Sequence, residues 1–535
     1  MSEVSMQKSS SGVFARKSSG LVRTVSTFDT FYFSLNQMNP AIGILTAAAL
    51  VAYPGASLEW ATILVLIGAI FLGISYALFS SVYPRSGAEY VPLSRVFHPL
   101  IGFVGSFSNT IWQGFYFGVA PAYAAAFAWA PMFLILGLQL DKPGLIDLGL
   151  WFDSPVGWFT VGSVIVLAGA FVLYRGAGTF FKVQRYIFSL ALFGFVVLLV
   201  VLGLGAAGVM NFEAAFDGYA GAGAYQALID TAAGYEIPLT PDMNMAETLN
   251  FMIWPGFAVL LAVWSTSFSG EVKNVTRGQL IAIPTAQTVG TLIMLGIGFF
   301  ARMALGDAGL RAFGIAALLD PDILPIPIYP WVSTLAALMT GSPLVSVIIL
   351  GGILLLFLVN TPAVAMYSTR SMLAWSIDGL APKWLGKVSE KYHTPSSAII
   401  VITVVAIAFL ALYSFTSFFS VLSAQISFSV VLGLTAFAAA IFPYVKRDVY
   451  ESSSAKIEFL GIPLMTISGL IAAVTMGFVG YRTAIDPING ANTPQSIGTI
   501  VGTFVVGALW YFYFVNKNKK EGVDMDARFD EIPIE

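Results

Sequence analysis

Long apolar segments, each about long enough to cross a lipid bilayer, recur along the whole chain. About 20 consecutive apolar residues span the hydrocarbon core of a membrane, and the sequence contains about twelve such segments. They lie near 28–51, 60–82, 99–137, 157–174, 186–210, 248–269, 280–301, 343–369, 397–413, 418–444, 459–481 and 497–515. A composition of 57% hydrophobic and 10% charged residues excludes an ordinary soluble globule. The pattern predicts an all-α integral membrane protein with about 12 transmembrane helices, because helices satisfy their own backbone hydrogen bonds in lipid.

The loops on the two sides of this predicted protein differ in charge. With an even number of spans, both termini lie on the side whose loops hold most of the Lys and Arg, and the opposite side collects Asp and Glu. Cytoplasmic loops are the ones that carry an excess of basic residues. We therefore expect a multi-pass protein of the cell membrane with both termini in the cytoplasm.

The first apolar segment is interrupted by polar residues and a proline. Pro40 lacks an N–H group and disfavours helical geometry at Asn39. Broken backbone at membrane depth is tolerated only where it is buried or lines a cavity. The start of a half-helix offers N–H groups and positive dipole to an anion, and freed carbonyl groups suit a cation. The interruption predicts a substrate site, the alternative being a proline kink whose gap is filled by neighbouring helices.

A second interruption, Pro255-Gly256, lies in the sixth segment. If spans one to five and six to ten form two halves, at about 25–210 and 247–444, the two interrupted spans correspond. Interruptions at matching places in two halves are a sequence pointer to a transporter site.

The sequence also predicts how the chain as a whole is divided and what its long loops are. Residues 1–24 are expected to be a disordered cytoplasmic N-terminus, 25–444 a transporter core, 445–516 two further helices and 517–535 a cytoplasmic tail. Within the core, Asn211–Glu247 is expected to be a long loop with room for a short surface helix. Ala304–Trp331 is expected to be an irregular segment, because it ends in several prolines.

Three motifs follow the second, sixth and eighth spans. They read YPRSGAEYVPLSRVFHPLIGF at Tyr83–Phe103, GEVKNVTRG at Gly270–Gly278 and SMLAWSIDGLAPKWLGKVSEKYHTPSSAI at Ser371–Ile399. Together they resemble the corresponding segments of the amino acid–polyamine–organocation (APC) permeases, over about residues 25–445. The resemblance implies a 5+5 inverted repeat with discontinuous helices 1 and 6, followed by two extra C-terminal helices. It also implies a secondary active amino acid permease that works by alternating access, as a symporter or an antiporter, and not an enzyme.

The resemblance places the substrate between spans one and six. The family's Gly-x-Gly bend falls on Ala41-Ile42-Gly43, of which only the last glycine matches. Together with Asn39 at the interruption, the matched positions give an expected substrate site of Asn39, Ala41, Ile42, Gly43, Gln113, Phe257, Ala258, Leu260 and Trp264. In this expectation the N–H groups of Ile42 and Gly43 bind the substrate carboxylate. Because the candidate walls include no acid or base, the sequence favours neutral or apolar amino acids.

The coupling ion is left open between Na⁺ and H⁺, and exchange without any ion is a further alternative. The position of the fifth-span lysine that some relatives use in place of sodium falls on Ala191, which disfavours that form of proton coupling. Sodium would need oxygen ligands, and a candidate ion site is formed by Asn36, Asn360 and Thr361. No other metal, no cofactor and no nucleic acid are expected as partners. The sequence gives no indication of oligomeric state.

Four charged residues of the motifs are expected to act at the inner face, as gating residues or as fixed elements of the loops. They are Arg85, Glu89, Glu271 and Lys273, whose opposite charges could pair and separate as helices move. No nucleophile–base set emerges, so no catalytic residue is expected. The alternatives to an amino acid permease are a transporter or exchanger of amines or polyamines, and a membrane sensor that binds an amino acid without moving it.

Overall fold

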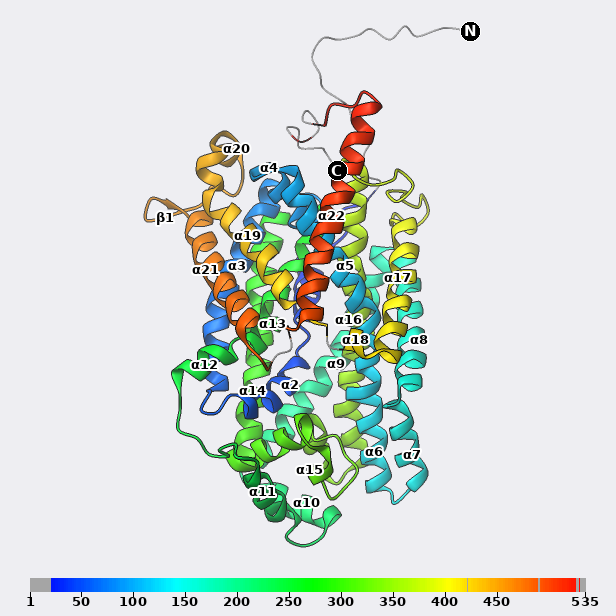
Figure 1. Cartoon of the computed structure of the whole chain (residues 1–535), viewed down its shortest axis with the longest axis vertical. Helices are drawn as coiled ribbons and strands as arrows, with labels where there is room; N and C mark the ends of the chain where they lie inside the picture. The colour runs from blue at the N-terminus through cyan, green and yellow to red at the C-terminus, as the bar shows by residue number, and fades with distance from the viewer. Residues whose placement is uncertain (1–20, 421, 489–490, 526–528, 530–535) are drawn as a thin grey trace.

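The computed structural model describes residues 21–420, 422–488, 491–525 and 529, and this part of the chain is almost wholly helical (Figure 1). Twelve of its helical segments are long and apolar enough to cross a membrane, which confirms the predicted class. In chain order they are α1–α2 (Thr27–Met38 and Ile42–Ala49), α3 (Leu58–Val82), α5–α6 (Pro99–Ala124 and Ala130–Gln139), α8 (Pro155–Tyr174), α9 (Ala177–Ala206), α12–α13 (Met245–Phe251 and Ile253–Val259), α14 (Val275–Leu318), α16 (Pro343–Ile377), α17 (Ser396–Phe415), α19 (Gln425–Val445), α21 (Leu464–Ile485) and α22 (Pro494–Lys520).

Shorter elements cover the two ends of this helical bundle (Figure 1). They are α4 (Tyr90–Val96), α7 (Pro143–Phe152), α10 (Phe212–Ala220), α11 (Ala224–Ala232), α15 (Val332–Thr340), α20 (Arg447–Ser452) and the two-residue strands β1 (Glu458–Phe459) and β2 (Ile462–Pro463), which pair antiparallel. The four-residue helix α18 (Ser417–Ser420) follows α17 and lies about midway between the two ends. We call the end with α4, α20 and the last turns of α22 the terminal face. The opposite end, with α7, α10, α11 and α15, is called the loop face.

The structure differs from the sequence predictions at three places outside the centres of the spans. The segment 304–331 is helical as far as Leu318, because α14 continues through a kink at Gly306, whose φ of 74° glycine adopts freely. The buried helix α15 was not predicted, since nine residues are too few to produce a membrane-span signal. Helix α22 extends to Lys520, so the predicted tail from 517 begins as helix. Most of the predicted N-terminal segment, residues 1–20, lies outside the described residues.

The first span breaks where the sequence predicts. Helix α1 begins with a capping box, in which Ser26 and Asp29 each satisfy the backbone N–H of the other. It ends at Asn39, which adopts a left-handed conformation with φ 48° and ψ 79°. Because the ring of Pro40 opposes helical geometry at the residue before it, the chain leaves the helix here and resumes as α2. Asn39 belongs to the residue types that tolerate this backbone conformation.

The sixth span differs from its prediction. Pro255 and Gly256 lie inside α13, and the helix passes through both. The missing N–H of Pro255 falls in the first turn of α13, where no helical partner exists for it. The change of backbone comes five residues after Pro255, where the span winds into a 3₁₀ helix over Leu260–Ser267. Within this turn the Thr266 hydroxyl donates to the carbonyl of Val263 at 2.8 Å, a local bond that competes with regular α-helical pairing.

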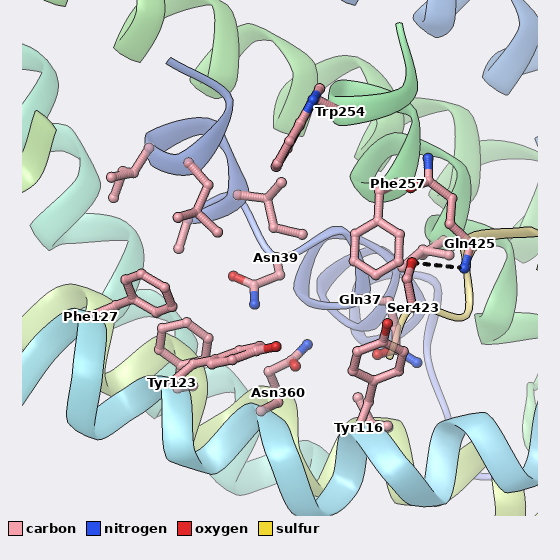
Figure 2. A pocket seen from close by; sticks show the side chains of 18 of the residues that line it. Gln37, Asn39, Tyr116, Tyr123, Phe127, Trp254, Phe257, Asn360, Ser423 and Gln425 are labelled. Atoms are coloured by element: carbon pink, nitrogen blue, oxygen red, sulfur yellow. Dashed lines mark hydrogen bonds between the residues drawn. The ribbon is translucent and has the colours of Figure 1, made fainter. Parts of the chain in front are cut away.

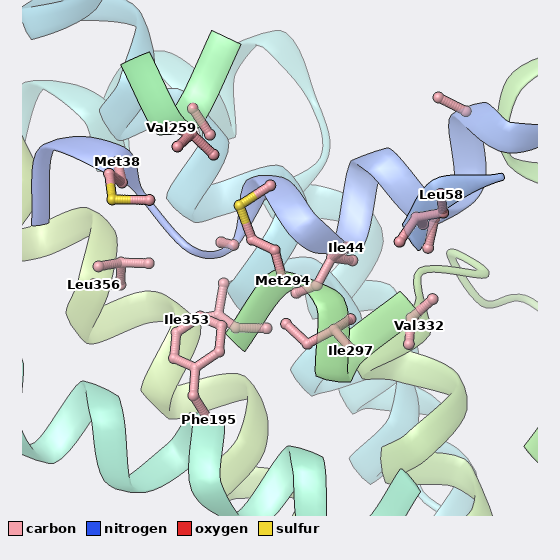
Figure 3. Close-up of a cluster of buried hydrophobic side chains, with 14 of the residues drawn as sticks. Met38, Ile44, Leu58, Phe195, Val259, Met294, Ile297, Val332, Ile353 and Leu356 are labelled. Carbon is pink, nitrogen blue, oxygen red and sulfur yellow. The ribbon is translucent and has the colours of Figure 1, made fainter. Parts of the chain in front are cut away.

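Apolar packing fixes the two half-helices of the first span against their neighbours (Figure 3). Met38 from α1 and Ile44 from α2 lie in one buried cluster with Met294 of α14 and Ile353 of α16. At Gly43, a Cβ atom would lie 3.2 Å from the Cα of Met294. The glycine therefore permits the close approach of α2 to α14.

Candidate functional site

A cavity of about 410 Å³ lies beside the break of the first span. Figure 2 shows Asn39 pointing into it, with Trp254 and Phe257 of α13 on one side and aromatic side chains of the third span on the other. A volume of this size is within the range of small-molecule sites. The polar residues of the lining are Gln37, Asn39, Gln113, Tyr116, Tyr123, Ser333, Asn360, Tyr413, Ser423 and Gln425, with the indole groups of Trp254, Trp264 and Trp331.

The cavity is polar but uncharged. Among the described residues that line it there is no Asp, Glu, Lys, Arg or His. Several buried polar atoms of the lining have no hydrogen-bond partner in the described chain, including both amide atoms of Gln37, Oδ1 of Asn39 and Nε2 of Gln113. Buried polar groups are nearly always paired. The unpaired amides therefore indicate a site for a small polar molecule that supplies both donors and acceptors.

The start of α2 borders this cavity through Ala41 and Ile42. No side chain caps this helix end, which leaves its positive dipole end facing the space. The N–H groups of Ile42 and Gly43 donate to the carbonyls of Asn39 and Pro40 at 2.9 and 3.1 Å. The expectation that these two groups are free for a carboxylate therefore needs correction, because an anion would have to share them.

The structure brings most of the predicted substrate residues together and separates three. Asn39, Ala41, Ile42, Gln113, Phe257 and Trp264 line the cavity. Outside that lining, Gly43 packs on Met294 and Ala258 is fully buried. Leu260 borders a smaller space that α13 shares with α19 and α21.

Several lining residues were not predicted from the sequence. They are Gln37, Tyr116, Tyr123, Trp254, Ser423 and Gln425. Gln37 and Trp254 carried a usable signal, since each lies within three residues of a proline that the sequence marks as an interruption. Tyr116 is three residues from Gln113 and thus on the same helix face. Gln425 lies at the start of α19, and its amide donates to the carbonyl of Ile253 at 2.6 Å, a contact between distant spans.

The candidate ion residues contact one another across the break. The Asn360 amide donates to the carbonyl of Asn36 at 2.8 Å, and the Asn36 amide donates to the carbonyl of Val359 at 3.1 Å. The Thr361 hydroxyl donates to Phe357 in its own helix. The backbone oxygens that a cation would need as ligands therefore already accept hydrogen bonds from side-chain amides.

Ionic and polar contacts between helices close the molecule on the terminal-face side of the cavity. Arg370 of α16 binds both carboxylate oxygens of Glu271, at 2.9 and 3.2 Å, and both residues are buried. Glu271 therefore pairs with Arg370 and not with Lys273, which is exposed. Arg85 is buried in the segment before α4, while Glu89 contacts neutral donors from α5 and α16.

A second ion pair joins α4 to the end of α16. Arg95 lies 3.0 Å from Asp378, and the hydroxyl of Tyr90 donates to the same carboxylate at 2.8 Å. Burial raises the pKa of Asp378, but the guanidinium groups of Arg95 and Arg85 more than offset this and leave the pKa below its ordinary value. The carboxylate is charged at neutral pH and joins two elements of the terminal face.

Toward the loop face the cavity meets aromatic side chains. A second space of about 280 Å³ shares Tyr123, Phe127, Trp331 and Tyr413 with the central cavity. The rings of Phe127 and Trp331 are 5.0 Å apart in an edge-on contact. Tyr329 beside them donates to the carboxylate of Asp153. These aromatic groups form the boundary between the central cavity and the loop face.

Comparison with known proteins agrees with this architecture. Residues 25–506 match the family model described as amino acid permease. The chain is 20% identical over 478 residues to the branched-chain amino acid permease BcaP of Lactococcus lactis subsp. cremoris (strain MG1363), covering 88% of this chain and 89% of that protein.

Proposed function

Since the chain belongs to the amino acid permease family, we propose that it is a secondary active transporter of neutral amino acids with apolar side chains. In this proposal the substrate binds in the central cavity, and the spans around it expose the cavity to one side of the membrane at a time. The observation that carries the substrate class is the uncharged lining of the cavity. A charged substrate side chain would lie there without a counter-charge, which is costly in a buried site.

The lining has groups for both ends of an amino acid zwitterion. The uncapped start of α2 is the positive end of the helix dipole, which favours a carboxylate. Oδ1 of Asn39 and Oε1 of Gln37 are unpaired acceptors suited to an ammonium group. Apolar and aromatic walls, among them Phe257, Ile353 and Val364, could contact the side chain. The relative from Lactococcus lactis is named as a branched-chain amino acid permease, which is in keeping with a side chain of this kind.

Uptake by purified protein in liposomes tests this proposal. Labelled leucine, isoleucine, valine and phenylalanine are compared with arginine, glutamate and the diamine putrescine. We expect the four apolar amino acids to be taken up and to compete with one another, while the three charged compounds do not compete. Preferred uptake of putrescine would instead support an amine transporter. Binding of leucine without uptake under any gradient would support a sensor.

We also propose that the terminal face is cytoplasmic in the cell membrane. This follows from the excess of Lys and Arg in the loops of that side. Single cysteines introduced at Lys387 and Thr240, which lie on opposite sides in this proposal, report the orientation in intact cells. A membrane-impermeant thiol reagent should label the second position and not the first.

A further inference from the structure

Glu89 is a fully buried carboxyl group whose contacts are all neutral. It precedes α4 and has no exposed surface. Its Oε1 accepts hydrogen bonds from the hydroxyl of Tyr367 and from the amide of Asn109. Its Oε2 has no hydrogen-bond partner among the described residues. No described Lys, Arg or His forms an ion pair with Glu89.

This carboxyl group lies next to the central cavity, on the side of the terminal face. Asn109 is one helical turn from Gln113 on α5, and Tyr367 is one turn from Val364 on α16. Gln113 and Val364 both line the cavity. The ring of Tyr367 also packs on the indole of Trp264, another lining residue, with centroids 5.7 Å apart. Glu89 is thus separated from the proposed substrate by one layer of side chains on two different helices.

The described charged and titratable groups around Glu89 do not provide it with a counter-ion. The phenols of Tyr76 on α3 and Tyr367 on α16 are the titratable groups that face it. Of the nearby guanidinium groups, Arg95 pairs with Asp378 and Arg370 pairs with Glu271. The third guanidinium group, that of Arg85 in the segment before α4, interacts electrostatically with Asp378 and with Tyr90.

An ionised carboxylate in such a place is unfavourable. Burial raises the pKa of Glu89, and the hydrogen bonds from Tyr367 and Asn109 lower it by less. A buried acid without a cationic partner favours its neutral form. Rearrangement that admits water at the terminal face would restore the ionised form, because hydration removes the cost of the charge.

We propose that Glu89 is the proton-binding site that couples amino acid transport to a proton gradient. The inference rests on the proposed function and adds the coupling ion to it. While the terminal face is closed, the Glu89 carboxyl group carries one proton taken from water of the cavity. When the terminal face opens, the O–H bond breaks and that proton passes to water on the other side, leaving the carboxylate. One proton therefore crosses with each substrate, and no other bond changes.

At the candidate sodium site one side-chain oxygen, Oδ1 of Asn36, has no hydrogen-bond partner among the described residues, but the backbone oxygens are occupied. The backbone oxygens of Asn36 and Val359 already accept hydrogen bonds from the amides of Asn360 and Asn36. A sodium ion would have to displace these amides before it could use the oxygens. Glu89 needs no such rearrangement to bind a proton.

Liposomes that contain the purified protein and a trapped pH-sensitive dye provide the first test. Addition of leucine outside should acidify the lumen in the wild type, and an inward proton gradient should concentrate leucine. Glu89→Gln keeps the shape of the side chain but cannot release a proton, so we expect both effects to be lost. Glu59→Gln makes the same chemical change at a loop-face carboxylate that pairs with Arg302, and it should behave as wild type.

Leucine exchange across the same liposomes separates coupling from folding, since exchange needs no net proton movement. If Glu89→Gln exchanges leucine but does not accumulate it under an inward proton gradient, the inference is supported. If this variant accumulates leucine under that gradient, the inference is overturned. Sodium-driven accumulation by the wild type without acidification overturns it as well. If the wild type shows neither uptake nor exchange of any amino acid, the proposed function itself fails.

A milder variant keeps the inference testable if Glu89→Gln does not fold. Tyr367→Phe removes a donor that stabilises the Glu89 carboxylate, so the pKa of Glu89 should rise further. Where the proton is required for binding, leucine affinity falls about tenfold per pH unit above that pKa. The pH at which affinity begins to fall should therefore be higher in Tyr367→Phe than in the wild type. An unchanged pH profile in this variant contradicts the proposal.

Discussion

The two interrupted spans, the first and the sixth, reach the cavity by different backbone solutions. In the first span the helix stops at Met38 and a left-handed Asn39 turns the chain before α2 begins. In the sixth span the helix α13 continues through its proline, and the backbone tightens into a 3₁₀ helix from Leu260.

The difference shows that the position of a proline within its helix decides its effect. Pro40 follows a complete helix, so it opposes continuation and leaves carbonyl groups of α1 without helical partners. Pro255 lies in the first turn of α13, where a missing N–H costs nothing. The first interruption is therefore imposed by local sequence, whereas the winding of the sixth span depends on its surroundings.

The largest expected contrast is between replacements of the two prolines. Pro40→Ala removes a penalty of about 3 kcal/mol against a continuous helix, which corresponds to about a hundredfold change in the population of the broken form. We expect leucine uptake to fall by a large factor in this variant. Pro255→Ala should change uptake little. Initial uptake rates, normalised to the amount of folded protein, measure both, and equal losses would remove the distinction between the spans.

A smaller contrast is expected between glycines in the two spans. Gly43→Leu places a side chain where even a Cβ atom would lie 3.2 Å from the Cα of Met294. Overpacking of this kind costs about 1–3 kcal/mol, so we expect less folded protein and a lower melting temperature. At Gly256 the nearest atom to an added Cβ is at 3.6 Å, so Gly256→Ala, in which the added methyl group fits, serves as the control. Thermal unfolding in detergent compares the two, and a Gly43→Leu protein with wild-type stability would contradict the packing described.

The smallest effects are expected at the amide contacts that join each interrupted span to a neighbour. Asn360 donates to the carbonyl of Asn36 in the first span, and Gln425 donates to the carbonyl of Ile253 in the sixth. The carbonyl of Asn36 keeps a second donor, the N–H of Asn39, so Asn360→Ala should cost only about 1 kcal/mol. Gln425→Ala should cost a similar amount.

These two amide replacements can be measured together. Because the two contacts have no partner in common, the double variant should show an additive loss of stability. Strong non-additivity would indicate that the two spans act as one unit. Thermal unfolding of the two single variants and the double variant supplies the comparison.

Much of the fold follows from the sequence, because membrane helices are specified by long apolar segments that lie locally along the chain. The break at Asn39-Pro40 was predictable for the same reason, since it depends on two adjacent residues. Ala258 and Leu260 were placed by matching positions with the family. The 3₁₀ winding that begins at Leu260 could not be predicted in this way, because it depends on the packing around the sixth span.

The remaining features of the site depend on contacts between distant residues. Glu271 and Arg370 are 99 positions apart, and their ion pair forms only when the sixth and eighth spans pack together. The pairing of Asn36 with Asn360 likewise requires the folded bundle. Residue types and local spacing indicate that such polar groups need partners, but they do not specify which partner each one finds.

The central claim is that an apolar amino acid binds beside the break of the first span. The natural chain contains no cysteine, so a single cysteine at Ala120, which lines the cavity, reports its occupancy directly. Leucine should slow the labelling of Ala120→Cys by a water-soluble maleimide. The matched control is Thr240→Cys at a separate loop-face cavity, where leucine should have no effect. Equal labelling of Ala120→Cys with and without leucine, in protein that transports leucine, would contradict the account.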